Sequence, residues 1–209
     1  FGSKIPIDEP AILEQYDLGH KWNYDADSDT WNKSDALQKS QPPEILFIER
    51  CVRFLKPGSG RLAMVLPDAI LGSPGLGYVR DWILKNTYVL ASIDMHPDTF
   101  QPSVSVQTSV LVLQRKTEEQ VQLEEAAGTQ NDYNVFMALA NHIGHDKRGN
   151  VLYVRDGHGN EIAEEQEILV KGRENGVPFY QRQKVQSKVV DDNTMQIAQE
   201  FRKWLYEQD

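Results

Sequence analysis

The sequence contains a single cysteine, Cys51, among its 209 residues. One thiol excludes an internal disulfide framework and a zinc site built on cysteines. No apolar run approaches the roughly 18 residues that a membrane-spanning helix needs. The N-terminal stretch FGSKIPIDEP lacks the basic start and apolar core of a secretory signal peptide. These absences predict a reducing, cytoplasmic setting and no membrane partner.

Basic residues are scarce, with 22 Lys and Arg against 31 Asp and Glu and a net charge of -9. A stand-alone nucleic-acid binder needs clustered Lys and Arg, so this balance argues against one. The charge is unevenly spread, however. Residues 117–132 hold four Glu and one Asp without a basic residue, and residues 171–188 hold five basic residues and one acidic. The second run leaves a local basic face open; the alternative is that both runs are solvated surface.

Local catalytic motifs are missing as well. The sequence holds no G-x-G-x-x-G, Walker loop, H-E-x-x-H or G-x-S-x-G. Its glycine-rich turn at 56–60 lies between a helix and a strand, whereas a phosphate cradle needs backbone amides at a helix N-terminus. His142 and His145 lie close to Asp146 in sequence, but no third ligand stands at a recognisable spacing. We therefore interpret them as surface histidines and predict no metal site.

What the sequence does contain is an alternation of helical and extended patterns after residue 42. In EILFIERCVRFL, one helical stripe contains Ile45, Ile48, Val52 and Leu55. The apolar runs RLAMVLP and YVLASIDM predict buried strands, and the Ser-Pro pair at 73–74 predicts a helix between them that extends to about residue 85. A third strand, VSVQTSVLVLQR, follows the short loop HPDTFQPS, so an antiparallel hairpin is expected there. The order predicts an α/β layered sheet.

The flanking segments differ in pattern. Residues 1–41 show neither the apolar period of a helix nor that of a strand, which predicts a long loop. Residues 117–132 predict an acidic linker. In 133–209, NVFMALA and VLYVRDGHGNEI predict strands, the second of which runs into a tight turn. Apolar residues recur at helical spacing near the end and predict an amphipathic helix over 193–207. The chain thus divides into residues 1–116, a linker and a C-terminal extension.

Four stretches together resemble one family. EILFIERCVRFLKPGSGRLAMVLPDAILGS and YVRDWILKNTYVLASIDMHPDTFQPSVSVQTSVLVLQRK look like amino-methyltransferases whose cofactor site precedes the catalytic motif. FGSKIPIDEPAILEQYDLGHKW is similar to the region that follows the catalytic motif in type I modification subunits. GHDKRGNVLYVRDGHGNEI is similar to the region downstream of that family's catalytic sheet. The resemblance extends to about Ile162 and indicates an adenine-N6 DNA methyltransferase of a type I restriction-modification system.

The resemblance implies a fold and a reaction. Residues 1–116 would be the C-terminal half of a Rossmann-like methyltransferase sheet that ends in an antiparallel hairpin. The reaction would transfer methyl from S-adenosylmethionine to an adenine flipped out of the duplex. The family's Asn-Pro-Pro motif would end just before Phe1, so the chain is expected to be inactive alone. The expected partners are DNA, the missing N-terminal half of the domain, and the specificity and restriction subunits.

The resemblance also assigns three aromatic residues. Phe1 matches the aromatic that closes the catalytic motif and would stack on the flipped adenine. Phe100, in the sequence Thr-Phe-Gln-Pro, matches the second aromatic of the target-base pocket. Phe47 matches a position that lies against the cofactor's adenine; the alternative is that it is a core residue of its helix.

Two further pairs of residues are candidates. Pro67 and Asp68 end a buried strand, at the edge where α/β sheets place ligands. Asp68 would line the active cleft, or alternatively cap the following turn. Lys147 and Arg148 would touch DNA phosphates, or alternatively form a solvated turn.

Two other functional classes stay open. The first is a non-catalytic interaction module with a methyltransferase-like fold, which the absent catalytic motif and the apolar face of the C-terminal helix favour. The second is a methyltransferase acting on RNA or protein. The similarity of the DLGHKW and GHDKRGN segments to modification subunits argues against that second class.

Overall fold

The computed structural model describes residues 5–129, 132–174 and 177–208. The strands are β1 (His20–Asp25), β2 (Thr30–Leu37), β3 (Arg61–Pro67), β4 (Thr87–Met95), β5 (Thr108–Arg115), β6 (Phe136–Ala140), β7 (Ala163–Glu174) and β8 (Val177–Lys188). The helices are α1 (Pro10–Leu13), α2 (Pro43–Phe54), α3 (Asp68–Gly72), α4 (Gly77–Asn86), α5 (Glu118–Ala127) and α6 (Thr194–Gln208), with 3₁₀ turns at Asp17–Gly19 and Pro74–Leu76.

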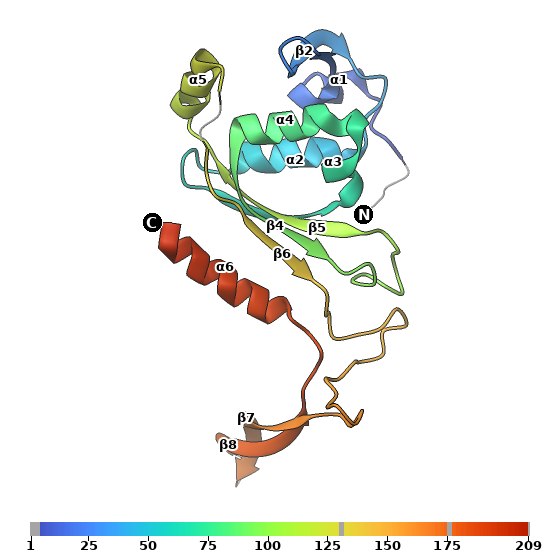
Figure 1. Ribbon diagram of the computed structural model, residues 1–209, viewed down its shortest axis with the longest axis vertical. Helices are drawn as coiled ribbons and strands as arrows, with labels where there is room; N and C mark the ends of the chain where they lie inside the picture. The colour runs from blue at the N-terminus through green and yellow to red at the C-terminus, as the bar shows by residue number, and fades with distance from the viewer. Residues whose placement is uncertain (1–4, 130–131, 175–176, 209) are drawn as a thin grey trace.

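A four-stranded mixed sheet organises the molecule, in the order β3-β5-β4-β6. β5 is antiparallel to both of its neighbours, and β6 is parallel to β4. The predicted α/β class and the antiparallel pairing of β4 with β5 are thereby confirmed. Because β3, β4 and β6 run in the same direction, their carboxyl ends lie along one edge of the sheet. Helices α2 and α4 cover one face, and α6 lies on the other (Figure 1).

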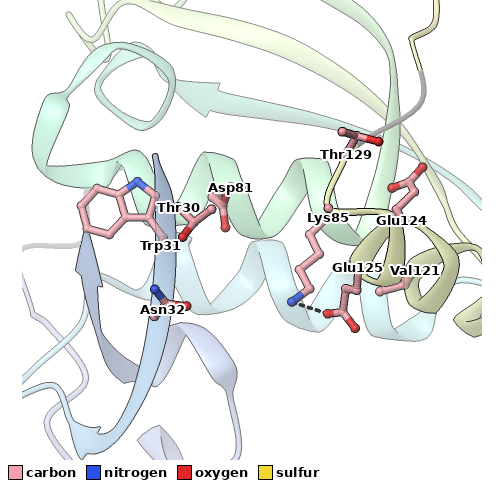
Figure 2. A pocket seen from close by; sticks show the side chains of 10 residues that line it. Thr30, Trp31, Asn32, Asp81, Lys85, Val121, Glu124, Glu125 and Thr129 are labelled. Carbon is pink, nitrogen blue, oxygen red and sulfur yellow. Dashed lines mark ion pairs between the residues drawn. The ribbon is translucent and has the colours of Figure 1, made fainter. Parts of the chain in front are cut away.

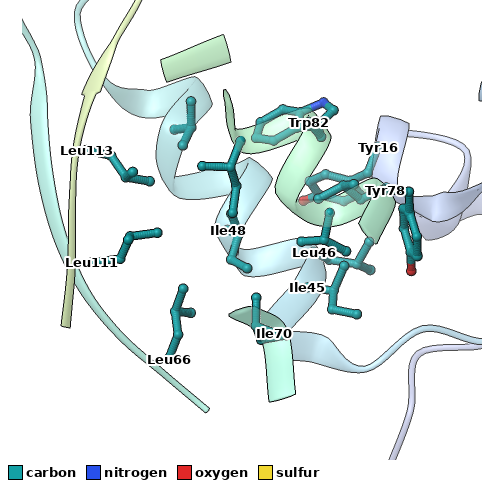
Figure 3. Close-up of a cluster of buried hydrophobic side chains, with 14 of the residues drawn as sticks. Tyr16, Ile45, Leu46, Ile48, Leu66, Ile70, Tyr78, Trp82, Leu111 and Leu113 are labelled. Atoms are coloured by element: carbon teal, nitrogen blue, oxygen red, sulfur yellow. The ribbon is translucent and has the colours of Figure 1, made fainter. Parts of the chain in front are cut away.

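The core lies between α2, α4 and the sheet. The predicted stripe on α2 is buried, with Ile48 at 0% and Val52 at 2% exposure. Figure 3 shows Ile48 facing Leu111 and Leu113 of β5, with Trp82 of α4 beside it. Each such side chain stabilises the fold by about 1.5–3 kcal/mol relative to an exposed position. This apolar core fixes the position of the sheet relative to α2 and α4.

The helix predicted from residue 73 begins later than expected. Residues Pro74–Leu76 form a 3₁₀ turn, and α4 begins only at Gly77. The Ser73 side chain makes no capping hydrogen bond; its carbonyl instead accepts one from Arg80 Nη1 at 2.8 Å. Gly75 and Gly77 have low helix propensity, which accounts for the delay.

The long loop predicted before residue 42 is corrected by the structure, because β1 and β2 form an antiparallel hairpin there. Tyr24 pairs with Trp31 across the strands, and their ring centroids lie 5.2 Å apart. Trp31 also lies 6.0 Å from Tyr78 of α4, which ties the hairpin to the helical layer. Cross-strand aromatic pairs of this kind stabilise a hairpin without the alternating apolar pattern that sequence analysis detects.

The predicted acidic linker is also corrected, since most of it is helix α5. Thr117 and Gln120 form a capping box at its start, and Gly128 ends it in the left-handed conformation at φ 65°. The helix is anchored by a buried ion pair, Lys116 Nζ to Glu124 Oε2 at 2.6 Å. The acidic residues on its first turn suit the positive end of the helix dipole.

The C-terminal region is partly as predicted. NVFMALA contains β6, and the amphipathic helix is confirmed as α6. Residues 151–162 form isolated bridges instead of the predicted strand, and β7 and β8 form a hairpin that the sequence did not predict. Within the described ranges, no helix combines the length and apolar character that crossing a membrane requires.

Candidate functional site

The candidate site lies at the carboxyl ends of β3 and β4. Pro67 ends β3, and the half-buried Asp68 begins the short helix α3 directly after it. Asp68 Oδ1 accepts a hydrogen bond from Ser109 Oγ at 2.9 Å, and its backbone N–H donates to Gln107 O at 3.1 Å. Asp68 makes no side-chain cap for α3; its carboxylate is held against β5, at the edge of the sheet.

Sequence analysis missed the polar residues that accompany Asp68. Ser109 is buried at the start of β5 and fixes the Asp68 carboxylate. Gln107 Nε2 reaches Asp94 Oδ1 of β4 at 3.5 Å, so polar groups cross from one strand end to the next. The signal was present in VSVQTSVLVLQR, where polar residues, among them Gln107 and Ser109, precede the apolar run VLVL. Polar groups in such a strand mark the edge where ligands bind.

Phe100 lies on the loop between β4 and β5, and it is half-buried. Local hydrogen bonds shape this loop: Thr99 Oγ1 donates to His96 O at 2.6 Å, and Val104 N donates to Phe100 O at 2.9 Å. The Gln101–Pro102 peptide bond is cis. Because the loop leaves the carboxyl end of β4, it projects Phe100 at the same edge of the sheet as Asp68.

Lys147 and Arg148 lie on an exposed turn held by Asp146. The Asp146 carboxylate accepts hydrogen bonds from the N–H of Arg148 at 2.8 Å and of Asn150 at 2.9 Å. The side-chain hydrogen bond from Asn150, together with these backbone bonds, lowers the pKa of Asp146. A Cβ atom placed on Gly149 would lie 3.8 Å from Pro102 Cδ, which is van der Waals contact. The backbone of the basic turn therefore lies close to Pro102, on the loop that carries Phe100.

Phe47, which the resemblance places against the cofactor, does not belong to this edge of the sheet. Phe47 lies on the outer side of α2 and is 55% exposed. The alternative that Phe47 is a core residue is therefore wrong, and its ring is available to a ligand. Phe1 lies outside the described residues.

A surface pocket of about 370 Å³ lies elsewhere, between β2, α4 and α5 (Figure 2). Its lining includes Trp31, Asp81, Lys85 and Glu125, and Lys85 pairs with Glu125 across it. Helix α4 leads directly into the start of β4, so this pocket lies at the amino end of that strand. It is at the opposite edge of the sheet from Asp68 and Phe100, and we do not include it in the candidate site.

Asp81 in this pocket makes stability depend on pH. Burial raises the pKa of its carboxyl, although nearby Lys85 lowers it. The stability that protonated Asp81 contributes is present below the ordinary pKa of 3.8 and is lost as pH rises through the higher folded value. Asp81→Asn should therefore raise the melting temperature at pH 7 by up to about 2 °C, and the gain should vanish near pH 3. Thermal melts at both pH values test this, with the exposed Asp35→Asn as a control; an equal gain at both would contradict it.

Known proteins give the candidate edge a context. A comparison with curated proteins found no similar sequence. A Listeria monocytogenes protein assigned to the class I S-adenosylmethionine-dependent methyltransferases is 22% identical, with a TM-score of 0.39, over 58% of this chain and 35% of its own. A modification subunit assigned to a type I restriction enzyme of Vibrio vulnificus is 23% identical, with a TM-score of 0.37, over 54% of this chain and 22% of its own. The chain thus spans about a third or less of each protein's length.

The family match is broader. The sequence model of the family described as N-6 DNA Methylase matches residues 12–164. This range includes the whole four-stranded sheet, the Phe100 loop and the Lys147–Arg148 turn. Because the match spans well over half of the 209 residues, the chain belongs to the N-6 DNA methylase family.

Proposed function

We propose that this chain is the target-base part of an adenine-N6 DNA methyltransferase, in the modification subunit of a type I restriction-modification system. The reaction transfers methyl from S-adenosylmethionine to an adenine flipped out of the duplex. The observation that carries the proposal is the proximity of the basic turn to the Phe100 loop, where Gly149 lies near Pro102, at the edge of the sheet that also holds Asp68. An aromatic ring, a carboxylate and two cations together suit a flipped base and its phosphates.

Each group has a physical role in this proposal. Adenine N6 is paired in duplex DNA, so the base must leave the stack before it reacts. Phe100 offers a ring on which the extruded base stacks, at a gain of about 1–3 kcal/mol. Lys147 and Arg148 hold the neighbouring backbone through phosphate contacts, which position the strand without reading its sequence. Asp68, fixed by Ser109, lines the cleft beside the base.

The fit of the chain to the cofactor rests on one residue. S-adenosylmethionine, when bound, supplies an activated methyl group on a sulfonium. Phe47 presents an exposed aromatic ring on a helix whose other large side chains are mostly buried, and such a ring suits the adenine of the cofactor. The glycine-rich turn at 56–60 connects α2 to β3 and has the wrong order for a cofactor loop.

The sheet itself supports a domain that continues beyond these strands. β3 is an outer strand of the four-stranded sheet, and its sequence RLAMVLP is almost wholly apolar. Apolar strands of this kind are typical of sheet interiors, and an uncovered edge invites pairing. We therefore assign the edge of β3 to strands from the N-terminal half of the same domain. That half would carry the Asn-Pro-Pro motif, which these 209 residues do not contain.

The test is methyl transfer from radiolabelled S-adenosylmethionine to an adenine-containing duplex. The isolated chain should give no turnover, because the groups that polarise the amine lie in the other half. A longer protein with Asn-Pro-Pro upstream of residue 1, assembled with a specificity subunit, should methylate the duplex. A duplex already methylated at N6 of the target adenine is the control.

Two results would contradict the proposal. Turnover by the isolated chain would show that its own residues suffice and that the assignment as a partial domain is wrong. No turnover by the longer, assembled protein would contradict the methyltransferase assignment. The non-catalytic interaction module would then be the better reading.

A further inference from the structure

The β7–β8 hairpin, which we call the arm, has no part in the site described above. Each strand has 12 residues, which corresponds to a length of about 40 Å. The arm lies at the end of the molecule farthest from α2 and α4 (Figure 1). It also contains the basic run, residues 171–188, in which five basic residues accompany one acidic residue.

One face of the arm is apolar and stabilises it. The register places Ile168, Val170, Phe179 and Val185 on this face, among glutamines. Phe179 lies directly over Gly172, since a Cβ atom on Gly172 would come within 2.4 Å of the ring. An isolated two-stranded hairpin is marginal in water, and this packing adds contacts across the strands, with Ile168 and Phe179 remaining 40% and 38% exposed.

The opposite face is basic toward the tip. It carries Lys171, Arg173, Tyr180 and Arg182, whereas Glu174 belongs to the apolar face. Lys171 lies over the Tyr180 ring at 6.0 Å. Nearer the body, cations of this face form ion pairs: Arg182 pairs with Glu167 at 3.2 Å and Lys184 with Glu165 at 2.7 Å. The arm therefore concentrates its positive charge at the end away from the body of an acidic protein.

The base of the arm is held by backbone hydrogen bonds to the segment that follows the Lys147–Arg148 turn. Val189 N donates to Ile162 O, and Val154 N donates to Val189 O, both at 2.9 Å. Lys188 Nζ pairs with Glu161 Oε2 at 2.6 Å. The segment held in this way continues from the Lys147–Arg148 turn, which lies near the Phe100 loop. The arm is thus fixed to the structure that faces the target base.

We propose that the arm binds duplex DNA beside the target site, with its basic face in the major groove. This inference rests on the proposed function, because it requires a DNA substrate. The major groove is wide enough for a two-stranded β-ribbon, and an arm of about 40 Å would cover roughly 12 base pairs at about 3.4 Å each. Exposed cations on an otherwise acidic chain are complementary to phosphate, and Tyr180 on the same face adds a hydrogen-bonding group.

The test compares duplexes of two lengths with the full modification complex. A triple variant, Lys171→Gln with Arg173→Gln and Arg182→Gln, removes the three cations nearest the tip of the arm. The two lysines nearer the body, Lys184 and Lys188, remain. A matched control, Arg202→Gln with Lys203→Gln, removes exposed charge from α6. Binding is measured by fluorescence anisotropy against salt concentration. Both duplexes carry the target site. The short duplex has flanks of about 6 base pairs on each side, and the long duplex has flanks of about 25. Only the long flanks exceed the arm's reach of about 12 base pairs.

The triple variant should bind the long duplex on the order of tenfold more weakly, and its salt slope should fall by about 2 to 3, or roughly 1 for each lost phosphate contact. Its binding to the short duplex should match that of the wild type, as should the binding of the α6 control to both. A second variant joins Ala163 to Lys188, which pair across the strands, through an Asn-Gly turn. It should show the same length-dependent loss.

Equal binding of the long duplex by wild type and both arm variants would overturn the inference. So would a loss of assembly with another subunit while DNA affinity is unchanged, because the arm would then bind protein. In either case, methylation of both duplexes by the wild type would leave the proposed function standing. If the wild type neither binds nor methylates either duplex, the proposed function itself fails.

Discussion

Phe100→Ala is expected to lower methyl transfer by the full modification complex about 5- to 150-fold. The figure follows from the loss of base stacking, which contributes about 1–3 kcal/mol per base. Phe100 lies on the loop that leaves the carboxyl end of β4, beside the basic turn at 147–148. Without its ring, the extruded adenine loses the surface that compensates for leaving the duplex, so fewer complexes reach the reactive state.

The fluorescence of a base analogue at the target position distinguishes a stacking role for Phe100 from a merely structural one. With 2-aminopurine at the target position, fluorescence rises when the base leaves the stack, and the alanine variant should lose most of this rise. Phe100→Trp should retain it, because any broad aromatic ring can stack. A mismatch opposite the target makes flipping easier and should restore part of the alanine variant's rate. Phe54→Ala, at another aromatic that is 74% exposed, is the control.

Two outcomes would argue against this role for Phe100. Unchanged fluorescence and rate in the alanine variant would mean that the base stacks elsewhere. A loss of rate with a normal fluorescence rise would place Phe100 in a later step than flipping.

The sheet and its first helix were predictable because their sequences are locally unambiguous. RLAMVLP and YVLASIDM are mostly apolar, a pattern typical of strands in a covered sheet. The α2 stripe, Ile45, Ile48 and Val52, has one period and one buried face. The antiparallel pairing of β4 with β5 followed from the length of the connection, because a parallel crossover needs about a dozen residues.

Other elements depend on contacts that local patterns do not contain. The β1–β2 hairpin is stabilised by aromatic pairs, including Trp31 against Tyr78 from a distant helix. The segment of α5 was predicted to be a linker because it is rich in acidic residues. A capping box and a buried ion pair with Lys116 stabilise a helix there instead. The packing of Gly149 near Pro102 joins two segments far apart in the sequence. The candidate residues were therefore predictable as types, while the proximity of the 147–148 turn to the Phe100 loop was not.

The most consequential of these distant contacts involves Glu49 of α2, whose side chain is fully buried. Its two carboxylate oxygens accept hydrogen bonds from the backbone N–H of Asp17 at 2.9 Å and of Leu18 at 2.8 Å, and Arg53 forms an ion pair with it. Burial raises the pKa of Glu49, although both N–H groups and Arg53 lower it. Because burial disfavours the charge, we expect Glu49 to stabilise the fold mainly through its two acceptor atoms, which fasten the start of the chain to α2.

Glu49→Leu is therefore expected to cost about 2–4 kcal/mol, because it leaves two backbone N–H groups without an acceptor at little change in volume. This loss corresponds to a fall in melting temperature of roughly 5–15 °C. Glu49→Gln keeps one acceptor oxygen and removes the charge, so its loss should be about half as large. Thermal melts followed by circular dichroism rank the two variants, with the exposed Glu14→Gln as a control. A glutamine variant as unstable as the leucine variant would mean that the charge, and its pairing with Arg53, holds the segment.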